Sequence, residues 1–223
     1  MKTTKKALLF TFCAVLLVVA SILGTMAYLT SSETVTNTFT VGNVNITLDE
    51  AKVDGDGTVE EGASRVKGNE YNLIPGHTYT KDPTVIVSKG SEESYVRMIV
   101  SINEQNDLDT IFSPGLPLNQ FFGGFDEEKW SLAATIKKDD TCSYEFRYAT
   151  TVSAKDAEKK LEPLFKTITV PGTVTNDDLD KIKDLKIDVV AHAIQADGFE
   201  DADAAWAAFD AQNKPSQDAT EGV

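Results

Sequence analysis

The chain has 223 residues, of which 35 are acidic and 21 are basic, so its formal net charge is −14. Such an acidic surface disfavours nucleic acid and anionic membranes as partners, and it suits a protein that stays soluble outside the cell or binds cations. The length suits one domain with a sizeable core, although two small domains also fit it.

The first 27 residues predict a cleaved secretory signal peptide, because lysines, an apolar run and small residues follow one another in the required order. The alternative is a retained membrane anchor, since an apolar run of 17 residues lies at the short end of what spans a bilayer. Cleavage before Tyr28 leaves 196 residues with a formal charge of −17 and limits membrane contact to the leader. The residues concerned are the lysines Lys2, Lys5 and Lys6, the apolar run Ala7–Leu23, and the small residues Thr25 and Ala27.

The segment after the leader predicts a β-strand that begins almost at once. Threonine occupies four alternate positions from Thr34 to Thr40, and a period of two is typical of a half-buried strand. After Gly42 the apolar positions change parity, which indicates a bulge or turn at Gly42-Asn43. The residues between and after the threonines are Val35, Asn37, Phe39 and Val41, and the apolar residues after the break are Val44, Ile46 and Leu48.

The stretch from Asp49 to Asn72 predicts a long surface loop, because it is rich in glycine and charge and has no sustained periodicity. Within it, Asp54-Gly55-Asp56-Gly57 resembles the start of a calcium loop, but the residues after Asp56 lack the EF-hand spacing. We interpret it as a tight acidic turn, with a specific calcium site as the alternative.

Short strands follow at close intervals, as in an antiparallel β-sandwich. One of them, Tyr95–Ile102, places Val96, Met98, Val100 and Ile102 on one face, and Arg97 and Ser101 on the other. Residues 130 to 152 predict an antiparallel pair that turns at Lys137–Asp140, with Trp130, Leu132, Ala134 and Ile136 on one face of its first strand. The remaining predicted strands are 84–88, 165–170 and 185–196.

Helical signals are few and short. We expect a helical turn over 106–112 capped by Asn106 or Asp107, and a short helix that begins at Ser153–Asp156 and is blocked by Pro163. Residues 175–180 predict an acidic turn. A helix over about 201–209 is expected to pack Trp206 and Phe209 onto the sheets. The sequence therefore predicts a mainly β protein with a few short helices: one β-sandwich domain over 28–210 and a disordered tail over 211–223.

The sequence gives no positive sign of catalysis, since it contains no HExxH, CxxC, GxSxG or phosphate-loop motif. Cys13 lies in the leader, so Cys142 is alone in the mature chain and is expected to be a small buried residue. His77 and His192 with a carboxylate form a conceivable zinc site, but we interpret His192 as a solvated strand residue. The aromatic residues Phe121, Phe122 and Phe125 predict either a lid on the core, which we favour, or an exposed patch.

Three stretches of the chain resemble the TasA/camelysin family of proteins exported by Gram-positive bacteria through a dedicated signal peptidase. In outline they cover about two-thirds of the mature chain. They are the junction Gly24–Thr30 with the threonine strand and Gly42–Ile46, the segment Asn72–Gly76 with Lys81-Asp82 and Gly90-Ser91, and the terminal strand Ile187–Ala196 with the Trp206 helix.

This resemblance implies a jelly-roll β-sandwich that acts as a secreted structural subunit of an extracellular matrix, biofilm or surface fibre. It implies that the segment Tyr28–Val41, freed by the signal peptidase, is a donor strand that completes the sheet of the next subunit, with Thr34–Val41 as the inserted part. The expected partner is a second copy of the chain, and no cofactor is expected. Two alternatives stay open: a camelysin-like surface metallopeptidase that uses His77 and His192, although no zinc motif matches, and a monomeric surface module that binds calcium or carbohydrate through Asp49–Asn72.

Overall fold

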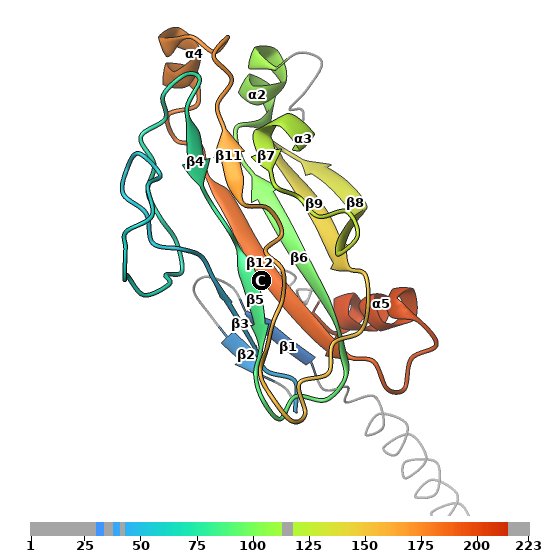
Figure 1. Cartoon of the computed structure of the whole chain (residues 1–223). Coiled ribbons are helices and arrows are strands. Elements are labelled where there is room, and N and C mark those ends of the chain that lie inside the picture. The colour runs from blue at the N-terminus through green and yellow to red at the C-terminus, as the bar shows by residue number, and fades with distance from the viewer. Residues whose placement is uncertain (1–29, 34–37, 41–42, 113–117, 214–223) are drawn as a thin grey trace, which may run out of the picture.

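The protein is mainly β, with antiparallel sheets and short helices (Figure 1), as the sequence predicts. The computed structural model describes residues 30–33, 38–40, 43–112 and 118–213. The layered arrangement is that of a β-sandwich, whereas the jelly-roll connectivity stays a prediction.

The largest sheet has six antiparallel strands, and two of its long members, β6 and β12, lie side by side at its centre (Figure 1). In order across the sheet, the strands are β2 (Thr38–Thr40), β1 (Thr30–Glu33), β12 (Ile187–Gln195), β6 (Ser94–Ile102), β9 (Thr141–Tyr148) and β8 (Trp130–Lys138).

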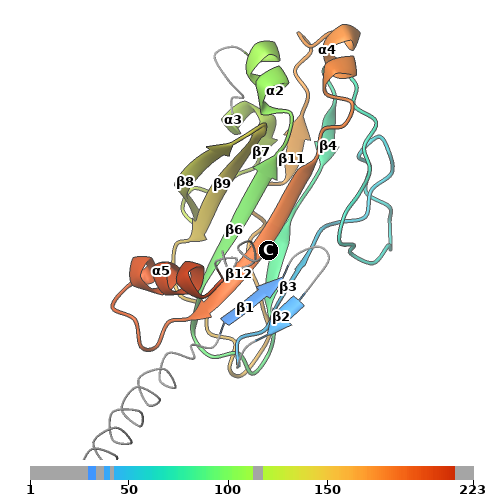
Figure 2. The same cartoon turned by 180° about the vertical axis from the view of Figure 1, so that it is seen from behind.

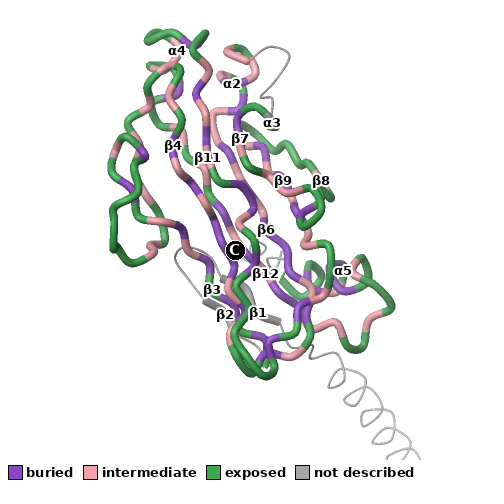
Figure 3. Tube along the Cα trace, in the orientation of Figure 1, coloured by how far each residue is buried: buried purple, intermediate pink, exposed green. Residues whose placement is uncertain are grey.

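Two three-stranded sheets cover the inner face of this large sheet. Their strands bury β-branched and aromatic residues against the alternate apolar residues of β6, and Figure 3 shows the buried positions running along the central strands. The predicted inward face of β6 is therefore confirmed. The first small sheet contains β10 (Lys159–Lys160), β5 (Thr84–Val87) and β3 (Ile46–Asp49), and the second contains β4 (Thr78–Thr80), β11 (Thr167–Thr169) and β7 (Phe122–Gly123).

The helices lie at the two ends of the sandwich. The first three are near one end, and α5 packs on the outer face of the large sheet at the other (Figure 2). Trp206 and Phe209 of α5 are buried, as expected, and Asp201 caps the N-terminus of the helix. None of the described helices is both long and apolar enough to span a bilayer. The helices are α2 (Gln105–Ile111), α3 (Leu118–Phe121), α4 (Asn176–Lys181) and α5 (Ala202–Gln212).

Two predictions about buried side chains are confirmed. Cys142 is fully buried on β9. Phe121 and Phe122 are buried in the core, and the Phe125 ring lies 5.4 Å from the Phe146 ring. The aromatic cluster is thus part of the core and not an exposed patch.

The helix predicted after Ser153 is wrong. This segment is a bend followed by a short strand: the Ala154 carbonyl accepts a hydrogen bond from the Gly90 N–H, and Leu161 donates one to the Val85 carbonyl. Lys159 and Lys160 pair with β5 as strand β10. A local helix-capping signal was overridden because the edge of β5 supplies hydrogen-bond partners and the core buries Ala154 and Leu161.

The opposite error occurs at residues 175–180, where the predicted acidic turn is the start of helix α4. Thr175 and Asp178 form a reciprocal capping box, in which each side chain accepts from the other residue's backbone N–H. The hydrogen bond with Thr175 and the Lys181 ammonium lower the pKa of Asp178 to about 2. The Thr-x-x-Asp signal was present in the sequence.

Helix α2 also begins differently from the prediction. Its N-cap is Glu104, which lies in the left-handed region at φ 54° and gives no side-chain cap, so neither Asn106 nor Asp107 caps the helix. Instead, the Asp140 carboxylate, in the turn between β8 and β9, accepts a hydrogen bond from the Asn106 N–H in the first turn of the helix.

Arg97 lies on the face of β6 opposite Val96 and Met98, as predicted, and it is only 2% exposed because α5 covers it. The face of two β8 residues was assigned incorrectly. Leu132 and Ile136 of β8 were grouped on the face of buried Trp130, but they are 48% and 60% exposed. A register shift between Leu132 and Ala134 breaks the alternation, and β8 lies at the edge of the sheet.

Gly57 allows a close backbone approach that gives a testable stability difference. Gly57 and Gly62 both adopt positive φ, at 76° and 74°, but a Cβ on Gly57 would lie 2.7 Å from the Tyr79 Cα, whereas nothing lies near Gly62. We expect Gly62→Ala to lower the free energy of unfolding by about 1–2 kcal/mol because of backbone strain. Gly57→Ala should cause the same loss and a further loss of about 1–3 kcal/mol because of overpacking. Urea denaturation of both variants tests this; equal losses would contradict it.

Candidate functional site

The two edges of strand β12 are used unequally. On one side, all nine residues from Ile187 to Gln195 pair with β6. On the other side, only Ala191–Ile194 pair, with β1. In the described chain no strand pairs with Ile187–Val190 on that side. Within the part of the chain that the structure describes, half of this central edge therefore presents unpaired backbone groups, which is what a further strand could pair with.

A groove of about 660 Å³ opens beside this unpaired half of β12. Its walls come from β3, the segment 67–73, β4 and the region of α4 that leads into β12. Its apolar lining belongs to the core, and charged residues of both signs stand at its rim. The apolar lining includes Leu48, Tyr79, Phe121, Ile168, Ile182 and Val189, and the rim includes Lys67, Glu70, Asp180, Lys183, Lys186 and Asp188.

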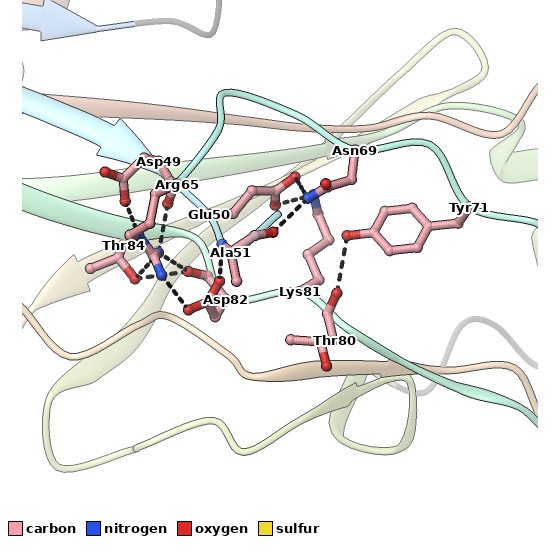
Figure 4. A network of polar contacts seen from close by, with 10 residues as sticks. All are labelled: Asp49, Glu50, Ala51, Arg65, Asn69, Tyr71, Thr80, Lys81, Asp82 and Thr84. Atoms are coloured by element: carbon pink, nitrogen blue, oxygen red, sulfur yellow. Dashed lines mark hydrogen bonds and ion pairs between the residues drawn. The ribbon is translucent and has the colours of Figure 1, made fainter. Parts of the chain in front are cut away.

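A network of ion pairs centred on Arg65 fixes the groove wall next to β3 (Figure 4). The Arg65 Nε donates to Asp49 Oδ1 at 2.5 Å, and its Nη1 donates to Asp82 Oδ2 at 2.8 Å. The second Nη donates to Thr84 Oγ1 at 2.9 Å. One guanidinium thus ties the end of β3 and the start of β5 to the loop between them.

A second pair in the same network is buried. The Lys81 ammonium donates to Glu50 Oε2 at 2.7 Å, with both side chains less than a tenth exposed. Asn69 donates to the other oxygen of Glu50 at 2.9 Å, and the Tyr71 hydroxyl donates to the Thr80 carbonyl (Figure 4). Burial, followed by the Glu50 charge, raises the pKa of Tyr71, so its hydroxyl stays a donor at all ordinary pH values.

The hydrogen bonds of Asn69 and Tyr71 hold the segment 67–73 in place, although this segment has no regular secondary structure. The Asn72 N–H donates to the Gly55 carbonyl at 2.7 Å, and the Tyr79 hydroxyl donates to the Asn72 carbonyl at 2.6 Å. The wall facing β12 is therefore preformed. An apolar trough beside an unpaired strand edge is the geometry that binds an extended peptide by β-augmentation.

The predicted histidine pair is not brought together. His77 lies beside β4, where its Nε2 is 2.8 Å from the Asp56 carbonyl and its ring contacts Tyr79. His192 lies on the outer face of β12, against Arg97 and Phe209. Within the described ranges, no three His, Cys, Asp or Glu residues are grouped to hold a metal ion.

The prediction that His192 is a solvated strand residue is wrong, because α5 covers it. Burial, together with the nearby Arg97 cation, lowers its pKa to about 4, and the Asp210 carboxylate opposes this shift.

The acidic sequence Asp54–Gly57 forms the predicted tight turn. Asp54 Oδ1 accepts from the N–H groups of Asp56 and Thr58, and the Asp54 carbonyl accepts from Gly57. The Asp54 side chain thus caps its own turn.

The donor-strand residues are only partly described. Phe39 belongs to β2, which pairs with β1 on the side away from β12. The cleavage residues Thr25, Ala27 and Tyr28, and the donor-strand residues Val35, Asn37 and Val41, lie outside the described residues. Strand β1, from the same segment, pairs within its own chain.

Comparison of the chain with protein-family models, with curated proteins and with solved structures found no match. The site therefore rests on its own geometry. Sequence reasoning missed the groove, because the residues that line it are spread from Leu48 to Val189 and no local pattern marks them.

Breaking the buried pair should destabilise the groove wall strongly. We expect Lys81→Met to lower the free energy of unfolding by about 3–5 kcal/mol, because it leaves the Glu50 carboxylate buried without its cation. In the matched control Lys52→Met, the lost partner is Glu60 in a pair that is 46% and 43% exposed, so the loss should be below about 1 kcal/mol. Urea denaturation measures both; similar losses would show that the burial of the pair does not matter.

Proposed function

We propose that the protein is a secreted structural subunit that assembles into extracellular matrix or surface fibres, and that the N-terminal strand of one copy completes the β12 edge of the next. One observation carries this proposal: the N-terminal strand already lies on the β12 edge, yet it covers only four of the nine residues. The remaining edge borders a groove with an apolar lining.

The register of β1 supports this assignment. In the antiparallel pairing, Thr30 is opposite Ile194 and Glu33 is opposite Ala191. An extended strand that continues this register beyond Glu33 would set Val35 opposite Val189 and Asn37 opposite Ile187. The unpaired part of the edge is four residues long, and so is the connection 34–37 between β1 and β2. An extended donor would therefore pair the edge from Ile194 to Ile187.

The energetic argument favours exchange between copies over pairing within one. Pairing within the chain uses four positions of β12, whereas an extended donor uses eight and adds an apolar side chain at the groove. Each additional cross-strand pair contributes roughly 0.2–1 kcal/mol. A leader still attached at Tyr28 would hinder the free entry of the donor, which suits an export signal that delays assembly until cleavage.

The composition suits this function. A formal net charge of −17 after cleavage favours solubility of the exported subunit before assembly, and the sequence has no catalytic motif. The metallopeptidase alternative has no supporting observation, because the His77 ring contacts the Asp56 carbonyl in a turn whereas the His192 ring contacts Arg97 of β6.

Two complementary variants test the exchange. The first variant begins at Tyr28 and carries Val189→Lys, so it keeps the donor strand, but the lysine side chain blocks its groove. The second variant begins at Gly42, so it keeps an open groove but lacks the donor strand. We expect each alone to be monomeric, an equimolar mixture to form one-to-one dimers by light scattering, and the unmodified mature chain to form fibres by electron microscopy.

The matched control is Ile136→Lys on the exposed edge strand β8, which should assemble like the unmodified chain. Circular dichroism checks that every variant is folded. Fibres from the chain without a donor, or a mixture that stays monomeric, would refute strand exchange.

The register can be tested separately by disulfide formation. With Cys142 replaced by alanine, Val35→Cys in one chain and Val189→Cys in another should form an intermolecular disulfide, because directly opposite residues place their Cα atoms within bridging distance. Asn37→Cys paired with Val189→Cys is two residues out of register and should cross-link poorly. Assembly without the first cross-link would refute this register while leaving strand exchange intact.

A further inference from the structure

Arg97 is a buried cation that holds α5 against the sheet. Its guanidinium donates to both oxygens of Asp210, at 3.2 and 2.5 Å, and to Glu145 of β9 at 3.4 Å. Its carbon Cζ lies 4.5 Å from the centre of the Trp206 ring and 5.0 Å from that of Phe209. Three side chains of α5 therefore meet at one arginine of β6.

The Nε–H of this guanidinium is directed at a histidine. Arg97 Nε donates to His192 Nδ1 at 3.1 Å, and the His192 ring lies 4.7 Å from the Phe209 ring. Arginine is always protonated and never accepts a hydrogen bond, so Nδ1 must carry a lone pair and the imidazole must be neutral. A proton on Nδ1 would set two donors and two positive charges against each other at this distance.

The charged groups around His192 come from three elements. Arg97 belongs to β6, Asp210 belongs to α5, and Glu145 of β9 approaches through the same guanidinium. Arg147 of β9 pairs with Glu145 and with Asp203 of α5. On the β1 side, the residue opposite His192 is Ser32, which does not titrate.

We propose that His192 is an acid-sensitive latch, and that its protonation releases α5 from the outer face of β12 and β6 while the rest of the sandwich stays folded. This regulatory function is independent of strand exchange. The apolar surface uncovered by release belongs to α5 and to the sheet beneath it, and includes Trp206, Phe209 and Ile194.

The direction of the pH dependence follows from the histidine. Its pKa in the folded protein is lowered to about 4, below the ordinary value of 6.5. The stability contributed by neutral His192 is therefore fully present above about pH 6.5 and is lost as the pH falls through about 4. Release is expected near the lower end of this window.

The two tryptophans of the described chain report separately on the latch and the core. Trp206 is on α5, and Trp130 is buried in the main core, where its Nε1 donates to the Glu162 carbonyl. Two single-tryptophan forms of the mature chain are made, Trp130→Phe and Trp206→Phe, and acrylamide quenching is measured from pH 7 to pH 3.5. Each is also made with His192→Asn, whose amide oxygen keeps a neutral acceptor for Arg97 but does not titrate.

We expect quenching of Trp206 to rise several-fold below about pH 4.5 while Trp130 stays protected, and His192→Asn to abolish this rise. Three results would overturn the latch. Trp206 could stay protected at pH 3.5, both tryptophans could become accessible together, or His192→Asn could leave the transition unchanged, which would assign it to Asp210 or Glu145.

Discussion

The unequal pairing of β12 is the constraint on which the rest of the structure depends. A buried backbone N–H or carbonyl needs a partner, so a central strand must be flanked on both sides or border a solvated groove. Strand β6 satisfies one side along its full length, and β1 satisfies half of the other. The segment 67–73 and α4 stand away from the remaining half, and the groove is the space between them. The ion pairs of Arg65 and Lys81 matter because they hold that wall apart from the edge.

The edge strand β8 is protected against pairing with a further strand, although it is longer than the unpaired part of β12. A bulge between Leu132 and Ala134 breaks its regular ladder, and Lys137 and Lys138 stand exposed at its end, both of which disfavour pairing with a further strand. The unpaired half of β12 has no register shift, and it includes the apolar residues Ile187 and Val189 beside the charged residue Asp188. This contrast supports β12, and not β8, as the edge that receives another copy.

Much of the fold could be predicted from sequence because strands with one buried face show strict alternation, as Val96 to Ile102 do. Most of the failures have one physical cause, which is a partner distant in the sequence. Helix α4 and the register shift in β8 are exceptions, because their causes are local. In the sequence His192 resembles a solvated strand residue, but α5, which begins ten residues after His192 and far from Arg97, covers both side chains. The segment after Ser153 has a helix-capping pattern, but the edge of β5 binds it as a strand. The groove could not be predicted at all, since it depends on where a loop without periodicity is anchored.

The buried charges are retained where elements from distant parts of the chain meet. Replacing a buried ion pair with apolar residues is often neutral for stability, so stability alone does not explain Arg97 or Lys81. Each has a geometric role: Lys81 joins β3 to the approach to β5, and Arg97 joins β6, β9 and α5 at one point. An apolar side chain at Arg97 would bury as well but would leave no directional contact to orient α5 over β12. The arginine that orients the helix also requires a neutral His192, because its Nε–H donates to His192 Nδ1. The packing of α5 is therefore sensitive to protonation of His192, whereas packing on an apolar side chain at position 97 would not be.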